Sequence, residues 1–282
     1  AVLYSNGTYN NASNVSDVGA ALYIGNTSVI TGGFHNIDSG RVYAGGAVLL
    51  DASVSGNQFI TRIGVGQLLD SGSAPLDGLI GFGIVHSLNT VVGTQTISEV
   101  GVGLGVLNGT TYTGSLINNG YLSGQGSVSL GGGVVGPEVA TVGVGMLVAN
   151  ASTVLGNVVN TVGGLLLGFG TVDYSGVTSG NSSSGIGYGL LIDGQSTVVG
   201  NVVNAGYIMG DGVVSNFAGS SGSSRVGTGL GLLRASLITG NISNSGLITG
   251  TSSGVHIHSL SSVGGSIINA ADATISGVSS AG

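Results

Sequence analysis

The chain of 282 residues has no cysteine, lysine or tryptophan, only 2 prolines, and charges on just 5% of its residues. Without cysteine, neither a disulfide nor a thiolate metal site can hold the fold together. The 4 arginines stand against 11 acidic residues, for a net charge of −7. Nucleic acid is therefore not an expected partner, because binding phosphates requires clustered cations. Ordinary domains carry about 25% charged residues, so a typical enzyme surface is not expected either.

Long hydrophobic runs are missing as well. The segment 139–172 contains no charge, but Asn, Ser, Thr and Gly interrupt it at short intervals. A membrane-spanning helix needs about 20 predominantly apolar residues, so no span is predicted. Valine and isoleucine are abundant while proline is scarce, which is unlike a disordered chain.

A repeated pattern fills most of the sequence that remains. It reads G-x-Φ-x-N-x-G-x-Φ-x-G, where Φ is apolar, and occurs as GSLINNGYLSG at 114–124, GNVVNAGYIMG at 200–210 and GNISNSGLITG at 240–250. Its asparagine marks Asn118, Asn160, Asn204, Asn244 and Asn269, at spacings of 42, 44, 40 and 25 residues. A second block precedes the first four markers: VGVGLGVL, VGVGMLVA, IGYGLLID and VGTGLGLL. Recurrence at such intervals predicts a repeat architecture.

Both blocks favour strands over helices. In the second block IGYGLLID, Ile186, Tyr188 and Leu190 alternate with Gly187 and Gly189, a period of two residues. Each interior glycine would also cost a helix about 1 kcal/mol. We predict an all-β protein, a right-handed parallel β-solenoid whose coils stack about 4.8 Å apart. A 40–44-residue repeat is either one coil with an excursion or two coils, the second degenerate.

The marker asparagines are predicted to stack as an Asn ladder at a coil corner. Asparagine tolerates the left-handed conformation of such corners, and stacked amides can hydrogen-bond from coil to coil. The following glycines, such as Gly206, are expected at a second corner with positive φ.

The glycines of the second block raise a separate expectation. If Val142, Val144 and Met146 fill the core, the alternating glycines line a flat outer face; the four positions concerned are Gly143, Gly145, Gly187 and Gly189. Such a face would suit lateral packing of another backbone. The alternative is that these glycines merely relieve crowding within a coil.

No catalytic, cofactor-binding or metal-binding residues are predicted. Asp51, Asp70 and Asp193 each follow an apolar strand, as expected of turn residues at coil corners. His256 and His258 share one face of a strand but lack a third ligand, so they indicate an exposed polar face rather than a zinc site.

The G-x-Φ-x-N-x-G-x-Φ-x-G block with its neighbouring strand resembles the repeats of bacterial autotransporter passengers and secreted β-helical adhesins, most clearly from about residue 100 to 277. The resemblance implies an extracellular or cell-surface solenoid. Three functions are compatible with it: a structural filament or sheath, an adhesin for glycans or host molecules, and a polysaccharide-processing enzyme.

The ends of the sequence favour the first of these functions. Neither AVLYSNGTYN nor ATISGVSSAG contains a helix signal, a charge cluster or a proline that would cap a solenoid. We therefore expect a self-assembling subunit joined end to end by β-strand pairing, with the adhesin as the alternative. Residues 1–17 are expected to form an N-terminal segment that supplies an inter-subunit strand, and residues 18–282 a single solenoid domain.

Overall fold

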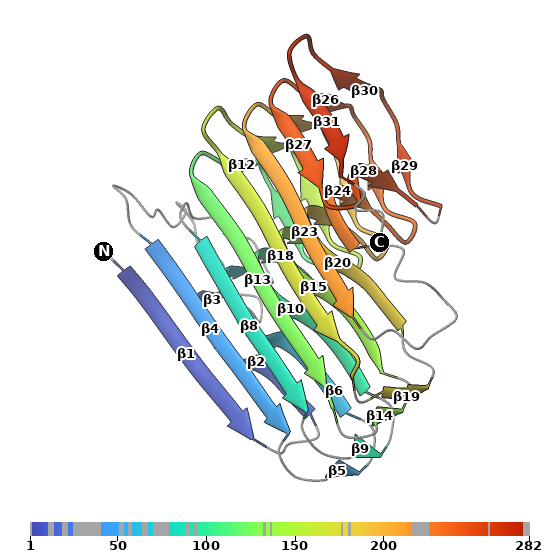
Figure 1. The fold of residues 1–282 in the computed structure, drawn as a ribbon. Coiled ribbons are helices and arrows are strands. Elements are labelled where there is room, and N and C mark those ends of the chain that lie inside the picture. The colour runs from blue at the N-terminus through green and yellow to red at the C-terminus, as the bar shows by residue number, and fades with distance from the viewer. Residues whose placement is uncertain are drawn as a thin grey trace.

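A computed structural model describes the fold (Figure 1). It describes the backbone of residues 2–10, 14–18, 22–24, 41–50, 54–55, 58–63, 67–69, 79–87, 91–92, 95–131, 134–135, 137–175, 177–179, 182–215, 226–258, 260–278. Side chains are described for residue 63 and for 96–131, 137–175, 182–215, 226–258 and 260–278.

All the secondary structure in the described residues is β-strand, and every strand pair in it is parallel. One layer is an eight-stranded sheet, which runs from blue to red across Figure 1. Its strands, in spatial order, are β1 (Val2–Asn10), β4 (Arg41–Leu50), β8 (Leu79–Ser87), β13 (Tyr121–Leu130), β18 (Leu165–Asp173), β23 (Tyr207–Ser215), β27 (Leu247–Gly250) and β31 (Thr274–Gly277).

A nine-stranded sheet faces the first one. Its main path is β2 (Asn14–Val18), β6 (Gln58–Ile63), β10 (Gln95–Val106), β15 (Glu138–Val148), β20 (Ser182–Ile192), β24 (Val226–Leu232) and β28 (Ser253–Ile257). Two further strands, β3 (Leu22–Ile24) and β7 (Gln67–Leu69), join it because β7 pairs with both β3 and β10.

Two five-stranded sheets close one side of the later coils. The first contains β11 (Thr111–Thr113), β16 (Thr153–Leu155), β21 (Thr197–Val198), β25 (Leu237–Ile238) and β29 (Ser262–Val263). The second contains β12 (Leu116–Asn118), β17 (Val158–Asn160), β22 (Val202–Asn204), β26 (Ile242–Asn244) and β30 (Ile267–Asn269). Two short pairs complete the set, β5 (Val54–Ser55) with β9 (Val91–Val92) and β14 (Val134–Val135) with β19 (Val177–Ser179).

This arrangement is a parallel β-solenoid, as the sequence predicts. Each strand pairs with the equivalent strand one repeat later; Val142, for example, pairs with Ile186, and Asn160 with Asn204. A repeat of 40–44 residues is thus one coil and not two. The final coil, β28 to β31, follows its predecessor by only 25 residues, because it lacks the outer part of the longer coils.

The predicted boundary between residues 17 and 18 falls inside β2. β1 is the first strand of the eight-stranded sheet and β2 the first strand of the main path of the nine-stranded sheet. Residues 2–10 and 14–17 are therefore part of the solenoid, where β1 pairs with β4 over nine residues.

In the long coils whose side chains are described, glycines line a zone where the two large sheets come close together, here called the waist. The strands β15 and β18 run past each other so closely that a Cβ on Gly143 would overlap the carbonyl of Phe169. Between β18 and β20, a Cβ on Gly168 would likewise overlap the carbonyl of Tyr188. One hydrophobic core, containing Met146 and Val148, lies on one side of this waist, and a second, containing Val139 and Val142, lies on the other.

The expected flat glycine face is wrong. Gly143, Gly145, Gly187 and Gly189 are all buried, and a Cβ on Gly145 would lie 2.7 Å from the carbonyl oxygen of Gly189 and 2.8 Å from that of Leu167. The physical reason is that strict alternation fails here, since Gly143 and Gly187 both have a φ of +68°. These glycines face backbone inside the solenoid, and no packing surface for another filament exists at them.

In β15 and β20, the nine-stranded sheet is buried on both faces. Leu147 and Leu191 lie in a third apolar cluster with Val144 and Tyr188, whereas their chain neighbours Met146, Val148, Leu190 and Ile192 belong to the first core. Val144 and Tyr188 are thus buried, as the sequence predicts, but in a different cluster from Met146 and Leu190.

Candidate functional site

The five marker asparagines form one continuous column on β12, β17, β22, β26 and β30. Asn118, Asn160, Asn204 and Asn244 each donate a hydrogen bond from Nδ2 to Oδ1 of the next asparagine, at 2.8 Å in every case. The first four are buried, with Asn204 only 1% exposed. The structure thus brings together all five residues that the repeat singles out.

The ladder has a direction that the backbone fixes. Each of the first four Nδ2 atoms also donates to a carbonyl of the next coil, as Asn160 does to Tyr207 at 3.2 Å and Asn204 to Leu247 at 3.1 Å. Oδ1 of Asn244 also accepts from the backbone N–H of Gly246 at 3.3 Å. If a side-chain amide were flipped, its oxygen would face those carbonyl oxygens. The Nδ2 donors therefore point towards the next, more C-terminal coil throughout the ladder.

The ladder asparagines are not in the left-handed conformation that the sequence suggested. Positive φ occurs instead at another corner, where two consecutive residues adopt it, as in Asn150–Ala151 and Arg234–Ala235. Gly206 also lacks positive φ. It is a glycine because a Cβ there would collide with the Gly164 carbonyl of the preceding coil.

Sequence reasoning missed a second polar column beside the ladder. Asn157, Asn201 and Asn241 accept backbone N–H groups of the next coil, with Asn157 Oδ1 2.8 Å from the nitrogen of Asn201 and Asn201 Oδ1 2.8 Å from that of Asn241. Asn241 Oδ1 in turn accepts a hydrogen bond from the backbone nitrogen of Ser266 at 2.7 Å. The signal was visible, because the residue after the first glycine of each repeat is Asn or Ser.

A third column consists of serine hydroxyls. The backbone nitrogens of Ser152, Ser196 and Ser236 each donate to the hydroxyl of the serine in the next coil, at 3.1 to 3.2 Å. Side-chain hydrogen bonds therefore tie the same coils at three points in addition to the sheets.

Asp193 sits at a coil corner, as its strand-end position suggests, and forms an ion pair with Arg234. Arg234 Nε donates to Asp193 Oδ1 at 2.6 Å, and Nη2 donates to Oδ2. The hydrogen bond to Asp193 raises the pKa of Arg234 above its ordinary value. The Asp193 side chain is 3% exposed and that of Arg234 46%. The other two acidic residues of this prediction, Asp51 and Asp70, lie outside the described residues.

Removing one partner of this pair should destabilise the solenoid. Arg234→Ala leaves a buried carboxylate unpaired, and we expect a loss of about 1–3 kcal/mol in unfolding free energy, reduced by the exposure of the arginine. In the coil before that of Asp193, Ala149 holds the column position of Asp193 and Asn150 holds that of Arg234. The double variant Asp193→Ala/Arg234→Asn should therefore recover most of the loss in denaturant unfolding. A double variant as unstable as Arg234→Ala would contradict this role.

The last coil presents an open edge, defined here as the outer side of β28 to β31. Ile267 is 50% exposed, whereas its counterparts Val202 and Ile242 in earlier coils are buried. Its neighbour Ile268 is 47% exposed and corresponds to Val203 and Ser243, which are only partly buried. Asn269 closes the ladder with its Nδ2 bonded to the carbonyl of Ala273 at 2.8 Å. Among the described residues, no further coil receives its amide.

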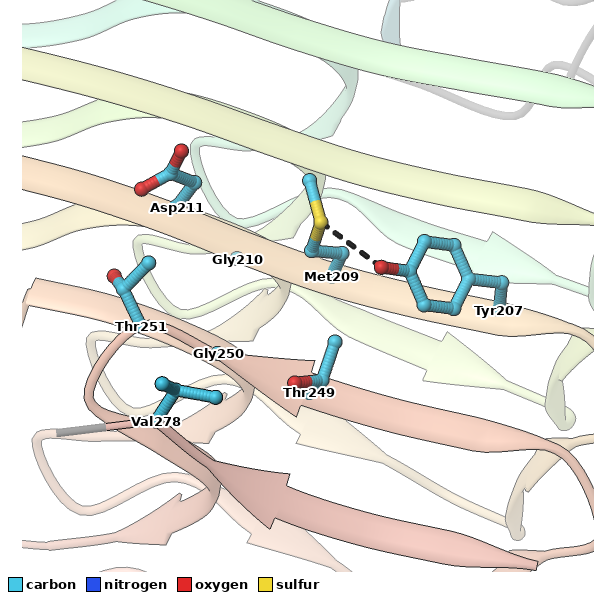
Figure 2. A pocket seen from close by; sticks show the side chains of 8 residues that line it. All are labelled: Tyr207, Met209, Gly210, Asp211, Thr249, Gly250, Thr251 and Val278. Carbon is cyan, nitrogen blue, oxygen red and sulfur yellow. Dashed lines mark hydrogen bonds between the residues drawn. The ribbon is translucent and has the colours of Figure 1, made fainter.

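A shallow groove lies on the outer face of β23 and β27 (Figure 2). Its volume is about 300 Å³. The Tyr207 hydroxyl donates to Met209 Sδ at 3.0 Å, and Asp211 lies farther along the same strand. Thr249, Thr251 and Val278 line the other side. The groove combines one aromatic ring, one carboxylate and three hydroxyl groups, those of Tyr207, Thr249 and Thr251.

His256, on β28, and His258, directly after this strand, lie side by side. Their rings meet edge to face with centroids 5.5 Å apart. In the part of the chain that the structure describes, no three His, Cys, Asp or Glu side chains lie close enough to bind a metal ion.

Comparison with known proteins adds no assignment. No family model, no curated protein and no solved structure matches the chain. Within the described residues, no helix has the length and apolar character needed to cross a membrane. The features of the chain that bear on its function are therefore the solenoid, its asparagine ladder and its open edge.

Proposed function

We propose that the chain is a structural protein, a self-assembling subunit of an extracellular filament or sheath whose copies join end to end by β-strand pairing. The observation that carries the proposal is the open edge of the last coil. There the sheets, the apolar core and the asparagine ladder all stop without a covering element among the described residues.

Such an edge favours pairing. Soluble β-proteins usually protect their edge strands with lysine, proline or bulges, because unpaired N–H and C=O groups recruit another strand. β28 to β31 contain no lysine, arginine or proline, and Asp272 is the one acidic residue in segment 253–278. Covering Ile267 and Ile268 would add about 25 cal/mol for each Å² of apolar surface removed from water.

The extracellular location is supported by the resemblance of the repeats to secreted β-helical proteins. A chain that is 41% hydrophobic and 5% charged buries its apolar edges when it assembles. A structural polymer made of copies of this chain needs no catalytic residue.

Charges placed on the open edge should block assembly without unfolding the subunit. Ile267→Lys/Ile268→Lys is expected to remain folded, because both side chains are about half exposed, and to shift sedimentation and light scattering from large assemblies to single subunits. The matched control Val162→Lys, at a position 83% exposed on a corner away from the edge, should assemble normally. Assembly of the double variant equal to that of the control would contradict the proposal.

The groove on β23 and β27 favours the alternative function, a surface adhesin. Tyrosine rings can stack on sugars, and the Asp211 carboxylate could accept hydrogen bonds from hydroxyl groups. Glycan-array binding that is lost in Tyr207→Ala and Asp211→Ala, by a protein that stays monomeric at all concentrations, would favour the adhesin over the filament.

A further inference from the structure

We propose that the groove on β23 and β27 binds an amino sugar in its protonated form, with the Asp211 carboxylate as the counter-ion of the ammonium group. All the residues that line the groove belong to one copy of the chain, so the site does not depend on the proposed assembly. It gives the alternative function, the adhesin, a defined class of ligand.

Three side chains of β23 point into the groove. Tyr207, Met209 and Asp211 are partly exposed, and the residues between them are buried. Alternate residues of a strand share one face, so the three side chains line the groove together (Figure 2). The Tyr207 hydroxyl donates to Met209 Sδ at 3.0 Å, which holds the ring along the strand and leaves the phenol oxygen to accept a hydrogen bond.

Asp211 is a partly buried carboxylate without a partner. Within the part of the chain that the structure describes, no hydrogen bond or ion pair reaches it. Asp173, on the same face of β18, instead accepts from the backbone nitrogen of Ser175 at 3.0 Å and from the Ser215 hydroxyl at 3.3 Å. A carboxylate can only accept hydrogen bonds, and its strongest ones come from charged donors. Asp211 is therefore placed to bind a cationic group.

The charge of the molecule favours a cationic ligand as well. The chain has a net charge of −7, and such a field attracts cations. Arg234, the one arginine whose side chain the structure describes, is paired with Asp193. None of the residues lining the groove is basic, so an anion would meet the Asp211 carboxylate without compensation. A metal ion fits poorly, because it needs several ligands and Asp211 is the one carboxylate among the lining residues.

The other lining residues suit a sugar ring better than a simple amine. Tyr207 and Met209 offer an apolar surface to the C–H face of a pyranose. Thr249 and Thr251 place hydroxyl groups on the opposite side of the groove. The Thr249 hydroxyl accepts from Ser276 Oγ at 3.2 Å, so its own proton remains to donate. A volume of about 300 Å³ is at the lower end of ligand pockets and suits a short saccharide.

Calorimetric titration with the glucosamine disaccharide and with its N-acetylated counterpart tests the site. The two sugars have the same rings, and acetylation removes the positive charge of the amines. At low ionic strength and at a pH that keeps the amines protonated, the glucosamine disaccharide should bind about tenfold more tightly, because hydrogen bonds to charged groups are the stronger ones. Asp211→Asn should bring the two affinities together, whereas Tyr207→Ala should weaken both.

The matched control is Asp173→Asn, which removes a carboxylate from the same sheet face outside the groove and should leave both affinities unchanged. Equal affinity of the unmodified protein for the two sugars, or no binding of either, would overturn the site. Equal losses in Asp173→Asn and Asp211→Asn would also overturn it, because they would show only general attraction of a cation to an acidic protein. Light scattering on the same samples reports the proposed assembly separately, so its failure and that of the site are distinguishable.

Discussion

Gly143→Ala should destabilise the solenoid by about 3 kcal/mol or more beyond the cost of its backbone conformation, because the added methyl group would overlap the Phe169 carbonyl across the waist. Backbone atoms of two packed sheets have no side-chain rotamer through which to relieve such an overlap. The change should appear as a large fall in the unfolding midpoint by circular dichroism, or as failure to fold.

Gly163→Ala is the matched control for this substitution. Gly163 has a φ of +84°, close to the +68° of Gly143, but nothing lies within 4 Å of the Cβ that alanine would add. It should therefore cost only the left-handed conformation of a non-glycine residue, about 1–2 kcal/mol. Equal losses for the two variants would show that the waist tolerates a side chain.

Asn204→Ala should cost about 2–4 kcal/mol of unfolding free energy. The substitution removes the acceptor of Asn160 and the donor to Asn244 Oδ1 and to the Leu247 carbonyl, and each buried group left without a partner costs about 1–3 kcal/mol. Chemical denaturation followed by circular dichroism measures the loss.

Asn119→Ala provides the comparison on the neighbouring position of the same repeat. Asn119 is exposed and accepts one solvent-facing hydrogen bond, from the Thr161 hydroxyl at 3.1 Å. Its removal should change stability by less than about 0.5 kcal/mol. If the two variants unfold at the same denaturant concentration, the ladder does not stabilise the coils.

The fold class was predictable from the sequence because stacking converts sequence periodicity directly into contacts. Residues that recur at the repeat interval become neighbours in adjacent coils, as Asn118 and Asn160 do at a separation of 42 residues. A buried amide in each coil can be satisfied only by the same group in the next coil or by its backbone. The pattern therefore indicated both the architecture and the ladder.

The orientation of the second block was not predictable in this way. Period-two reasoning assumes extended backbone throughout, but Thr141 and Gly143 have φ values of +57° and +68° within β15. The alternation of Val144 with the neighbouring glycines then no longer shows which face of the strand is buried. The sequence offered crowding within a coil only as the alternative role of these glycines, and the close contact of two backbones at Gly143 and Gly168 became visible only in the structure.

The length of the repeat was ambiguous for a related reason. A 40–44-residue interval could accommodate two ordinary coils, and the Ser- and Gly-rich stretches carry no strand signal. Pairing of β15 with β20 from Glu138 to Val148 shows one long coil, whose second core around Val142 and Val172 lies beyond the waist. The 25-residue last coil is what remains when that part is absent.

Electron cryo-microscopy of the purified protein at rising concentrations tests the central claim most directly. If copies join end to end by β-strand pairing, filaments should appear as the concentration rises, with the usual strand spacing of about 4.8 Å along their axis. The strands should lie across the filament axis. Single particles at every concentration, or filaments whose strands run along the axis, would contradict the account.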